Sequence, residues 1–543
     1  MASAVETPFQ TSGLVRLTRP QLYGTMAGLL LSVLLASLDQ TIVGTAEPRI
    51  IAQLSGFNRY PWVSTAYLLS STIAVPIFAK LSDIYGRKWF FLLGAASFVL
   101  TSALCGASGD LTFLPFDGMN QLILFRGLQG LGGGMMMGLA FTIIGDVFSP
   151  VERGKYQGFF AATYGLSSIF GPTLGGWLTD QISWRAVFYV NLPVGLIAIT
   201  AIYLYFPYWR PHGIHRRIDW AGVFSLIGCM VPLLLALTWV TDYGWSSARV
   251  ESLLAVAAIM LVTFLFAETK ALEPMIPLSL FRDPVISLSS LAVFVLGMGM
   301  FGVIIYLPLF MQGVMGVTAT QSGNLLTPLL IASVGGSILT GQLNLRLRTY
   351  KPQAVVGSVL IAIGMILFAR MGAGTQHFEV IRNMVISGIG MGLLMPVYTV
   401  AVQNVAPRKH MGAATASTTF FRQIGSTVGV AIFGSVLLTN YHRDFAKGVP
   451  SGIPADALQP FSNPLMLGQF RPQLEAAFGK LPGGPALLQT LFGNVRTSLV
   501  HGLQLIFFSS AVVMTAAIVL NVLLRNVPLR HHSAADHSEP PAH

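Results

Sequence analysis

Apolar segments of roughly 20 residues recur along the whole chain, separated by short polar turns, and we count about fourteen of them. A helix of that length crosses the hydrocarbon core of a bilayer, so each segment predicts one membrane-spanning helix. The pattern therefore predicts an all-helical, polytopic membrane protein. The predicted spans are 22–46, 61–81, 89–108, 119–147, 155–178, 186–206, 219–240, 250–268, 285–312, 321–343, 353–371, 381–404, 412–438 and 500–524.

Composition supports this prediction. Hydrophobic residues make up 53% of the 543 residues and charged residues 10%, against about 25% charged residues in an average soluble domain. The mean hydropathy is +0.67. The loops and tails are too dispersed to form a catalytic domain, and the G-x-S-x-G, H-E-x-x-H and P-loop patterns are absent from the sequence. We therefore expect that the protein is not an enzyme.

Basic residues indicate which side of the membrane each loop faces. If the N-terminus is cytoplasmic, roughly 19 of the 32 Lys and Arg residues fall in cytoplasmic segments, against about six near short outer loops. Both termini are therefore predicted to be cytoplasmic, and the predicted location is the plasma (inner) membrane. The formal net charge of +11 follows from this bias and from attraction to anionic lipids, so it gives no reason to expect a nucleic-acid partner.

The termini and the cysteines suggest no cofactor. The first apolar span lacks a small-residue cleavage site, so no cleaved signal peptide is expected. Cys105 and Cys229 both fall in predicted helices, which leaves no disulfide framework and no metal-ligand spacing. The polar tail 526–543 is expected to be disordered, and its histidines lack the spacing of a metal site.

An internal repeat divides the chain into two related halves of six helices. Parallel repeats about an axis along the membrane normal are a known plan of membrane transporters. The predicted parts are a cytoplasmic N-terminal segment 1–21, a first half 22–206, linkers with an inserted helix pair 207–284, a second half 285–525 with a long outer loop 441–499, and the tail 526–543. At one constant offset, the matching glycines are Gly130 and Gly388, Gly132 and Gly390, Gly134 and Gly392, Gly154 and Gly412, Gly171 and Gly429, and Gly176 and Gly434.

The segment GLSSIFGPTLGG places glycines and a proline inside a predicted span. Glycines at helical spacings allow a neighbouring helix to approach closely, and Pro172 removes a backbone donor and bends the helix. The alternative is an ordinary small-residue packing face. The glycines that we expect to make close contacts are Gly165, Gly171, Gly175 and Gly176.

The segment AKLSDIYGRKWFF follows the second predicted span and carries the features of a cytoplasmic latch. Gly86 permits a tight turn before Arg87 and Lys88. Asp83 can lie near a helix end and pair with Arg87 or with the other half of the protein. Asp146, at the cytoplasmic end of the fourth predicted span, is the other predicted partner of Arg87.

These segments resemble signatures of a known family. GLSSIFGPTLGG resembles the antiporter motif of drug and proton antiporters of the major facilitator superfamily, and AKLSDIYGRKWFF resembles the superfamily's loop signature, with Ala79 in place of its opening glycine. RGLQGLGGGMMMG resembles the fourth-helix signature, and LDQTIVGTAEPRI resembles the first-helix signature of the fourteen-helix antiporters. The resemblance implies a major facilitator fold and proton-coupled export of drugs or antiseptic cations, without specifying the substrate.

Charges inside the membrane are the candidates for proton coupling, because an unpaired charge at the bilayer centre costs several kcal/mol. Asp39, in the first span, can exchange a proton when it is desolvated; the alternative is a structural hydrogen bond between helices. Arg126, in the fourth span, keeps its charge and must find acceptors. The resemblance links both residues to proton coupling, whereas a structural role for Arg126 is a fixed charge that joins helices.

Glu47 departs from the family pattern, which usually has an aliphatic residue at this point. It lies about two helical turns from Asp39 and toward the same side of the predicted helix. One interpretation is a second proton or cation site. The other places Glu47 at the outer interface, paired with Arg49 or with solvent.

Other polar, aromatic and methionine residues are candidates for a substrate cavity, because Met repacks easily and aromatic faces attract organic cations. The alternative is packing or contact with lipid, and for Arg422 it is structural pairing. In the outer loop, Leu474, Phe478, Leu487, Leu488 and Leu491 predict short amphipathic helices on the membrane surface or over the cavity mouth. The cavity candidates are Gln40, Met136, Tyr306, Tyr398 and Arg422.

We expect the protein to export lipophilic or cationic organic compounds by alternating access, in exchange for protons. Its expected partners are a small-molecule substrate, protons and the lipid bilayer, and whether a periplasmic adaptor takes part stays open. The expected energy source is the proton gradient. The first alternative is a proton-coupled symporter that imports a small organic solute, and the second is a membrane sensor or enzyme.

Overall fold

The structure is a computed structural model, and the regular secondary structure of the residues that it describes is entirely helical. The all-helical fold class predicted from the sequence is therefore confirmed. The described residues are 17–148, 150–208, 219–271, 274, 278–347, 349–406, 411–450, 453, 458–462, 464, 467, 474–476, 478, 479 and 483–527. The N-terminal segment up to residue 16, most of the linker after residue 208 and the tail from residue 528 lie outside them.

The helices of the first half begin where the sequence supplies a start signal. Pro is the second residue of α1 and of α2, in the first turn, where the missing N–H has no helical partner in any case. The Asp117 carboxylate caps α4 by accepting the Asn120 N–H. The elements are α1 (Arg19–Leu54), η1 (Phe57–Arg59), α2 (Tyr60–Tyr85), α3 (Arg87–Gly106), α4 (Gly118–Val147), α5 (Pro150–Gln181), α6 (Ala186–Tyr189) and α7 (Asn191–Tyr205).

The inserted pair and the second half use the same start signals. Asp219 caps α8, and Asp283 caps α10 directly before a proline. The elements are α8 (Trp220–Tyr243), α9 (Ala248–Lys270), η2 (Leu278–Arg282), α10 (Pro284–Gly313), α11 (Ala319–Leu347), α12 (Lys351–Ala369), α13 (His377–Val405), α14 (Met411–Gly448), η4 (Gln459–Ser462) and α17 (Gly484–Leu523).

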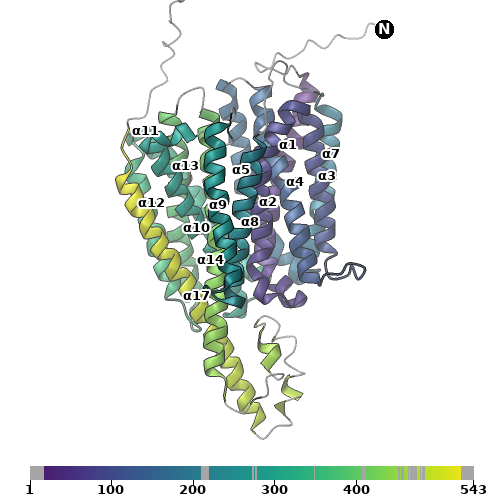
Figure 1. Cartoon of the computed structure of the whole chain (residues 1–543), viewed down its shortest axis with the longest axis vertical. Helices are drawn as coiled ribbons and strands as arrows, with labels where there is room; N and C mark the ends of the chain where they lie inside the picture. The colour runs from purple at the N-terminus through teal and green to yellow at the C-terminus, as the bar shows by residue number, and fades with distance from the viewer. Residues whose placement is uncertain are drawn as a thin grey trace, which may run out of the picture.

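The helices run along one common direction in a single bundle (Figure 1). Within the described residues, 12 helices are long and apolar enough to cross a membrane. The helices α2 and α5, of 26 and 32 residues, pack in the same bundle. The chain is therefore a multi-pass membrane protein, and a count of fourteen crossings stays a prediction. The helix α1 begins and the helix α17 ends at the same end of the bundle, which we call the termini end (Figure 1).

The glycine repeat is visible as matching helix contacts in the two halves. A Cβ on Gly130 or Gly134 of α4 would lie 2.4 Å from a backbone oxygen of α2. A Cβ on Gly388 or Gly392 of α13 would lie 2.3 and 2.0 Å from backbone oxygens of α11. These distances are far shorter than any real Cβ contact, so only glycine allows the helices to approach this closely. The packing of α4 on α2 in the first half thus corresponds to that of α13 on α11 in the second.

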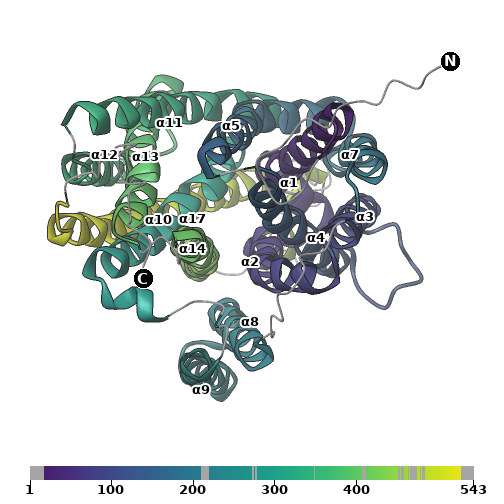
Figure 2. The same ribbon diagram turned by 90° about the horizontal axis from the view of Figure 1, so that it is seen from above.

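Glycines of the same repeat also lie at contacts between the two halves. Seen along the bundle, α1 to α7 form one group and α10 to α17 the other (Figure 2). Gly176 of α5 faces the start of α11, where a Cβ would lie 2.3 Å from the Ala319 oxygen. Its repeat partner, Gly434 of α14, faces the start of α2, where a Cβ would lie 2.0 Å from Pro61. Both contacts lie toward the end of the bundle opposite the termini.

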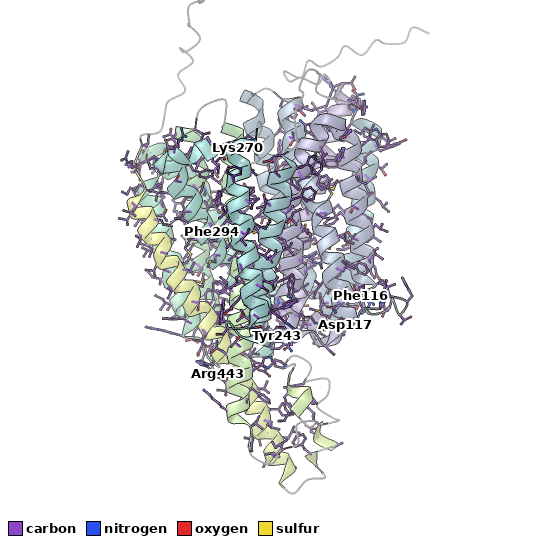
Figure 3. All side chains as sticks on the ribbon, in the orientation of Figure 1. Phe116, Asp117, Tyr243, Lys270, Phe294 and Arg443 are labelled. Carbon is purple, nitrogen blue, oxygen red and sulfur yellow. The ribbon has the colours of Figure 1, made fainter. Side chains whose placement is uncertain are left out.

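The inserted pair α8–α9 lies outside the two groups, beside α2 and α14 (Figure 2). Leu234 and Leu237 of α8 pack with Ala431 of α14 and Leu69 of α2, so α8 contacts both halves. Lys270 and Tyr243 mark opposite ends of the pair (Figure 3). Large apolar side chains of α9 are exposed, as expected for a surface that faces lipid; they include Ile259, Leu261, Val262, Leu265 and Phe266.

The helices α14 and α17 project beyond the bundle at the end opposite the termini (Figure 1). They have 38 and 40 residues, much longer than the predicted spans 412–438 and 500–524. Tyr441 and Phe445 of α14 are buried together with Phe461, and the Tyr441 hydroxyl donates to the Phe461 oxygen at 2.7 Å. The projection therefore has a small apolar core of its own.

This core corrects the prediction for the outer loop. Leu487, Leu488 and Leu491 belong to the long helix α17, and Leu474 and Phe478 are buried in the apolar cluster that includes Tyr441. The expected short helices are therefore wrong for Leu487, Leu488 and Leu491. Leu474 and Phe478 are helical in the structure, but they are buried in the protein and do not lie on a membrane surface. The reason is that α14 continues outward with its own apolar side chains, so the amphipathic pattern has a protein partner.

The segment GLSSIFGPTLGG packs against α1, but its glycines are not equivalent. A Cβ on Gly171 would lie 2.0 Å from the Thr41 hydroxyl, and one on Gly175 would lie 2.5 Å from the Ile42 backbone oxygen. For Gly165 the nearest atom would be 4.0 Å away, which is ordinary van der Waals contact. The expectation of a close contact at Gly165 is therefore wrong. Gly165 faces Val334 of α11 at a distance, although α5 still contacts α1 at Ser167.

We predict that Gly175→Ala lowers the free energy of unfolding by about 1–3 kcal/mol, because overpacking against a backbone atom forces α1 and α5 apart. Thermal unfolding of the purified protein in detergent measures this change. Gly165→Ala is the matched control on the same helix, and it should leave the stability unchanged or raise it by up to about 1 kcal/mol. Equal destabilisation by the two substitutions would contradict this difference in packing.

Candidate functional site

Asp39 lies in the middle of α1 and is completely buried, with 0% of its surface exposed. One carboxylate oxygen accepts a hydrogen bond from Arg126 Nη1 of α4 at 2.5 Å. The other accepts hydrogen bonds from Gln129 Nε2 at 3.0 Å and from Asn191 Nδ2 at 2.9 Å. Three helices, α1, α4 and α7, thus meet at one carboxylate, and the donors around it suit its ionised form.

Arg126 is also buried, with 2% of its surface exposed, and its guanidinium is held on several sides. It donates to the Val63 backbone oxygen at 3.3 Å and to Gln129 Oε1 at 2.8 Å. The Tyr67 ring centroid lies 4.4 Å from its central carbon. The positive charge is therefore matched by one carboxylate and further stabilised by neutral acceptors and an aromatic face.

The network extends through residues that sequence reasoning missed. Asn191 Nδ2 also donates to Ser102 Oγ at 3.1 Å, and Ser102 Oγ donates to the Phe188 oxygen at 2.9 Å. Gln129 had a recognisable signal, since it stands three residues after Arg126 and therefore on the same helix face. Asn191 had only the weaker signal of an amide at the start of an apolar helix.

Asp39 and Arg126 were separate candidates in the sequence, and the structure brings them together as an ion pair. A proton on Asp39 must displace hydrogen bonds that the carboxylate accepts from Arg126 or from the two amides, and it removes the charge that attracts Arg126, which stays charged in either case. A proton and the guanidinium therefore compete for the same carboxylate. A proton on Asp39 would therefore weaken contacts among α1, α4 and α7.

Glu47 lies two turns further along α1 and is also 0% exposed. One of its carboxylate oxygens accepts a hydrogen bond from Ser64 Oγ of α2 at 2.9 Å, whereas the other has no hydrogen-bond partner in the described part of the chain. Arg49 is exposed. The interpretation of Glu47 as an interfacial residue, paired with Arg49 or with solvent, is therefore wrong, because α2 and α10 cover this turn of α1.

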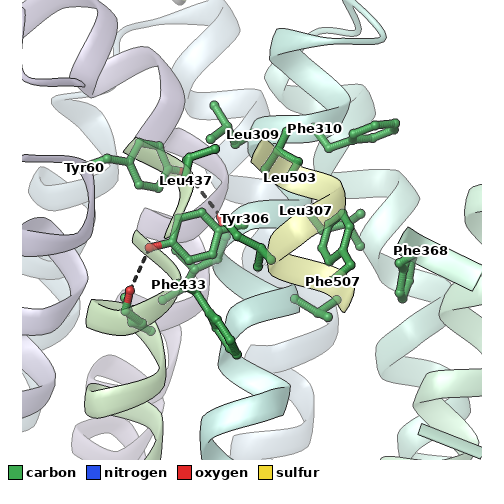
Figure 4. Close-up of a cluster of buried hydrophobic side chains, with 14 of the residues drawn as sticks. Tyr60, Tyr306, Leu307, Leu309, Phe310, Phe368, Phe433, Leu437, Leu503 and Phe507 are labelled. Carbon is green, nitrogen blue, oxygen red and sulfur yellow. Dashed lines mark hydrogen bonds between the residues drawn. The ribbon is translucent and has the colours of Figure 1, made fainter. Parts of the chain in front are cut away.

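Beside Glu47 the two halves meet in a contact that we name the α1–α10 closure, formed by Thr45, Glu47, Tyr60, Tyr306 and Gln312. Gln312 Nε2 of α10 donates to the Thr45 backbone oxygen at 2.9 Å. The Tyr60 and Tyr306 rings stack with centroids 5.6 Å apart, and the Tyr60 hydroxyl donates to the Ile305 oxygen at 3.2 Å (Figure 4). This closure lies toward the end opposite the termini.

A second contact between the halves lies at the same end, where α5 meets α11. Asp180 at the end of α5 accepts hydrogen bonds from the Thr320 backbone N–H at 2.7 Å and from its hydroxyl at 2.6 Å. A Cβ on Gly323 of α11 would lie 2.1 Å from the Pro172 oxygen, so Pro172 also belongs to this contact. The two halves are therefore closed at the end opposite the termini.

The predicted latch residues lie at the termini end, within the first half. Gly86 has φ of 102°, a left-handed conformation that strongly favours glycine, and it joins α2 to α3. Arg87 Nε donates to the Asp146 carboxylate at 2.8 Å, and Lys88 Nζ donates to the Tyr203 oxygen at 2.8 Å. These two hydrogen bonds thus join the start of α3 to α4 and α7. The side chain of Asp83 lies outside the described residues.

The predicted cavity residues occupy different surroundings. Met136 is buried in a cluster of the first half, and the Tyr398 hydroxyl donates to Asn521 of α17, so the contacts of both are packing contacts inside one half. Tyr306 belongs to the α1–α10 closure. Gln40 is half-buried and hydrogen-bonded to Tyr67. Arg422 is half-buried on α14, and we find no ion pair for it among the described residues.

Comparison with known proteins adds independent information. The sequence profile of the Major Facilitator Superfamily matches residues 29–430. The chain is 37% identical over 541 residues to the multidrug transporter protein MdtP of Bacillus subtilis, covering 95% of each chain. It is 36% identical over 441 residues to multidrug resistance protein 3 of the same organism, covering 80% of this chain and 84% of the relative.

The fold is also similar to that of a solved structure. A bacterial homologue of the human lysosomal transporter Spinster, in an inward-facing and unoccupied conformation, superposes with a TM-score of 0.64. The superposition covers 94% of this chain and 99% of the other at 18% sequence identity, so it supports the fold alone.

We predict that the two partners of the buried ion pair respond unequally to removal. Asp39→Leu leaves a guanidinium that cannot lose its charge, so it should lower the free energy of unfolding by about 3–5 kcal/mol. Arg126→Leu should cost less, because the remaining carboxyl can take up a proton. Chemical unfolding of the purified variants in detergent measures both changes, and a greater loss for Arg126→Leu would contradict this assignment.

Proposed function

The chain belongs to the major facilitator superfamily of membrane transporters, and from that premise we propose that it exports lipophilic or cationic organic compounds in exchange for protons. Two relatives named for multidrug transport or resistance, each more than one third identical to this chain, support export of organic compounds. The four sequence signatures support the finer assignment to the fourteen-helix drug and proton antiporters. The proton gradient is the proposed source of energy.

The buried Asp39–Arg126 pair is the observation that carries the proposal. A carboxylate at the centre of an apolar bundle is costly, and such residues mark ion and proton pathways in membrane proteins. Because Arg126 and a proton compete for Asp39, protonation loosens the junction of α1, α4 and α7. A protein with this junction can couple proton binding to the relative position of its helices.

The proposed cycle exposes the space between the halves to one side of the membrane at a time. From the positive-inside rule we propose that the termini end faces the cytoplasm and that the membrane is the plasma (inner) membrane. On this orientation the closed end faces outward. A proton taken from outside by Asp39 then favours release of the substrate outside, and its loss to the cytoplasm resets the transporter.

We predict that Asp39→Asn abolishes substrate accumulation driven by a pH gradient while substrate binding is retained. The amide keeps the size of the side chain and much of its hydrogen bonding but cannot exchange a proton at physiological pH. Transport in proteoliposomes with an imposed pH gradient, together with equilibrium binding of the same substrate, measures both properties. Accumulation at the wild-type level by the Asn variant would exclude Asp39 as the coupling residue.

Asp110→Asn is a suitable control, since Asp110 is an exposed acid paired with Arg185 at the surface. It should leave transport unchanged. Everted membrane vesicles distinguish export from the alternative of solute import, because an exporter accumulates substrate in them and an importer does not. A drug-susceptibility panel in an efflux-deficient host, with wild type and Asp39→Asn compared, would identify the class of substrate.

A further inference from the structure

The burial of the Glu47 carboxyl group is not accounted for by the Asp39–Arg126 pair. It is a fully buried carboxyl group at the contact between the halves, and one of its oxygens is without a hydrogen-bond partner among the described residues. Buried polar groups are normally hydrogen-bonded, and a buried charge is normally paired. The closed state thus tolerates Glu47 at a position where ionisation is poorly compensated.

The groups that face Glu47 are almost all neutral. Ser64 supplies its one hydrogen bond, and the Tyr60 and Tyr306 rings stand within electrostatic range. Gln312 donates to the Thr45 backbone oxygen rather than to Glu47. Arg126 is the cation within electrostatic range, but its charge is already matched by Asp39 at 2.5 Å. An ionised Glu47 would therefore be a nearly uncompensated charge inside the α1–α10 closure.

Separation of the halves changes this situation. When α10 moves away from α1 and α2, water reaches the turn that carries Glu47, and a hydrated carboxylate no longer costs buried-charge energy. The closed arrangement therefore favours the carboxyl form of Glu47, and the open arrangement accepts the carboxylate. A group with such a preference shifts the equilibrium between two conformations when it gains or loses a proton.

We infer that Glu47 is a proton-binding site of the α1–α10 closure: the halves close there when Glu47 holds a proton and separate when it loses it. This inference rests on the proposed function, since it assigns a regulator to the alternating-access cycle. The proton on Glu47 arrives from the outer side as the closure forms and returns to that side as it opens. It is not carried across the membrane, so Glu47 adds no proton to the number exchanged per substrate.

The experiment measures closure directly, without transport. A cysteine at Ile305, which is buried and whose backbone oxygen accepts the Tyr60 hydrogen bond, reports access to the closure. The purified protein in detergent is treated with a charged maleimide between pH 6 and 9, and the labelling rate is compared in Ile305→Cys with and without Glu47→Gln. The ratio of the two rates cancels the pH dependence of the thiol itself. The chain without the probe gives the background from Cys105 and Cys229.

We expect this ratio to rise with pH, by up to about tenfold per pH unit, because a single proton links the two states. The variant with Gln should stay poorly labelled at every pH. Glu47→Met, which is similar in length and cannot ionise, should behave like Glu47→Gln. Asp180→Asn is the matched control for an acid at the other contact between the halves, and it should retain the pH dependence.

Two results would overturn the inference. One is a ratio that does not change with pH. The other is that Glu47→Gln changes the number of protons exchanged per substrate molecule by one, measured in proteoliposomes. That result would make Glu47 a second coupling residue. If the Gln variant fails to fold, the Met variant alone decides. Labelling does not depend on transport. A labelling result that contradicts the inference would therefore leave the Asp39→Asn prediction standing. If the Asp39→Asn prediction failed instead, the labelling result could still be interpreted.

Discussion

The absence of water inside a lipid bilayer is the constraint on which this structure depends. Each buried polar group must find its partner within the protein, and each buried charge needs a counter-charge. Asp39 and Arg126 satisfy this rule by binding each other and by recruiting Gln129 and Asn191. The same rule underlies the proposal that the junction of α1, α4 and α7 responds to protons, because a neutral Asp39 would leave Arg126 without its counter-charge.

Close helix packing gives the two halves their rigidity. Apolar side chains gain little by leaving lipid for protein, so helices in a membrane associate through short contacts between backbones. In this protein these contacts are made by glycines whose missing Cβ atoms would collide with backbone oxygens, as at Gly130, Gly175 and Gly392. Halves that are packed in this way can move as units, which is what alternating access requires.

Most of the fold was predictable from the sequence because hydrophobic length and glycine spacing are local signals. The helices, the repeat and the packing of Gly171 and Gly175 all follow from such signals. Pairings between distant positions were less accessible: sequence reasoning required a partner for Arg126 but could not select Asp39, Gln129 and Val63 together. The burial of Glu47 depends on α2 and α10, and the extension of α14 and α17 depends on their contact with each other, so neither could be read from one segment.

The contacts made by Gly176 and Gly434 are arranged as in a two-fold symmetric dimer. In such a dimer, if position i of the first copy contacts position j of the second, then position j of the first contacts position i of the second. Within this chain, α5 of one half meets the start of α11, and its counterpart α14 meets the start of α2. In a dimer of two identical chains, any substitution at this surface would appear at both contacts. Within a single chain the two contacts can differ, and α8 lies beside the contact between α2 and α14. The inserted pair therefore breaks the symmetry of the two contacts, which a symmetric dimer of identical chains could not do.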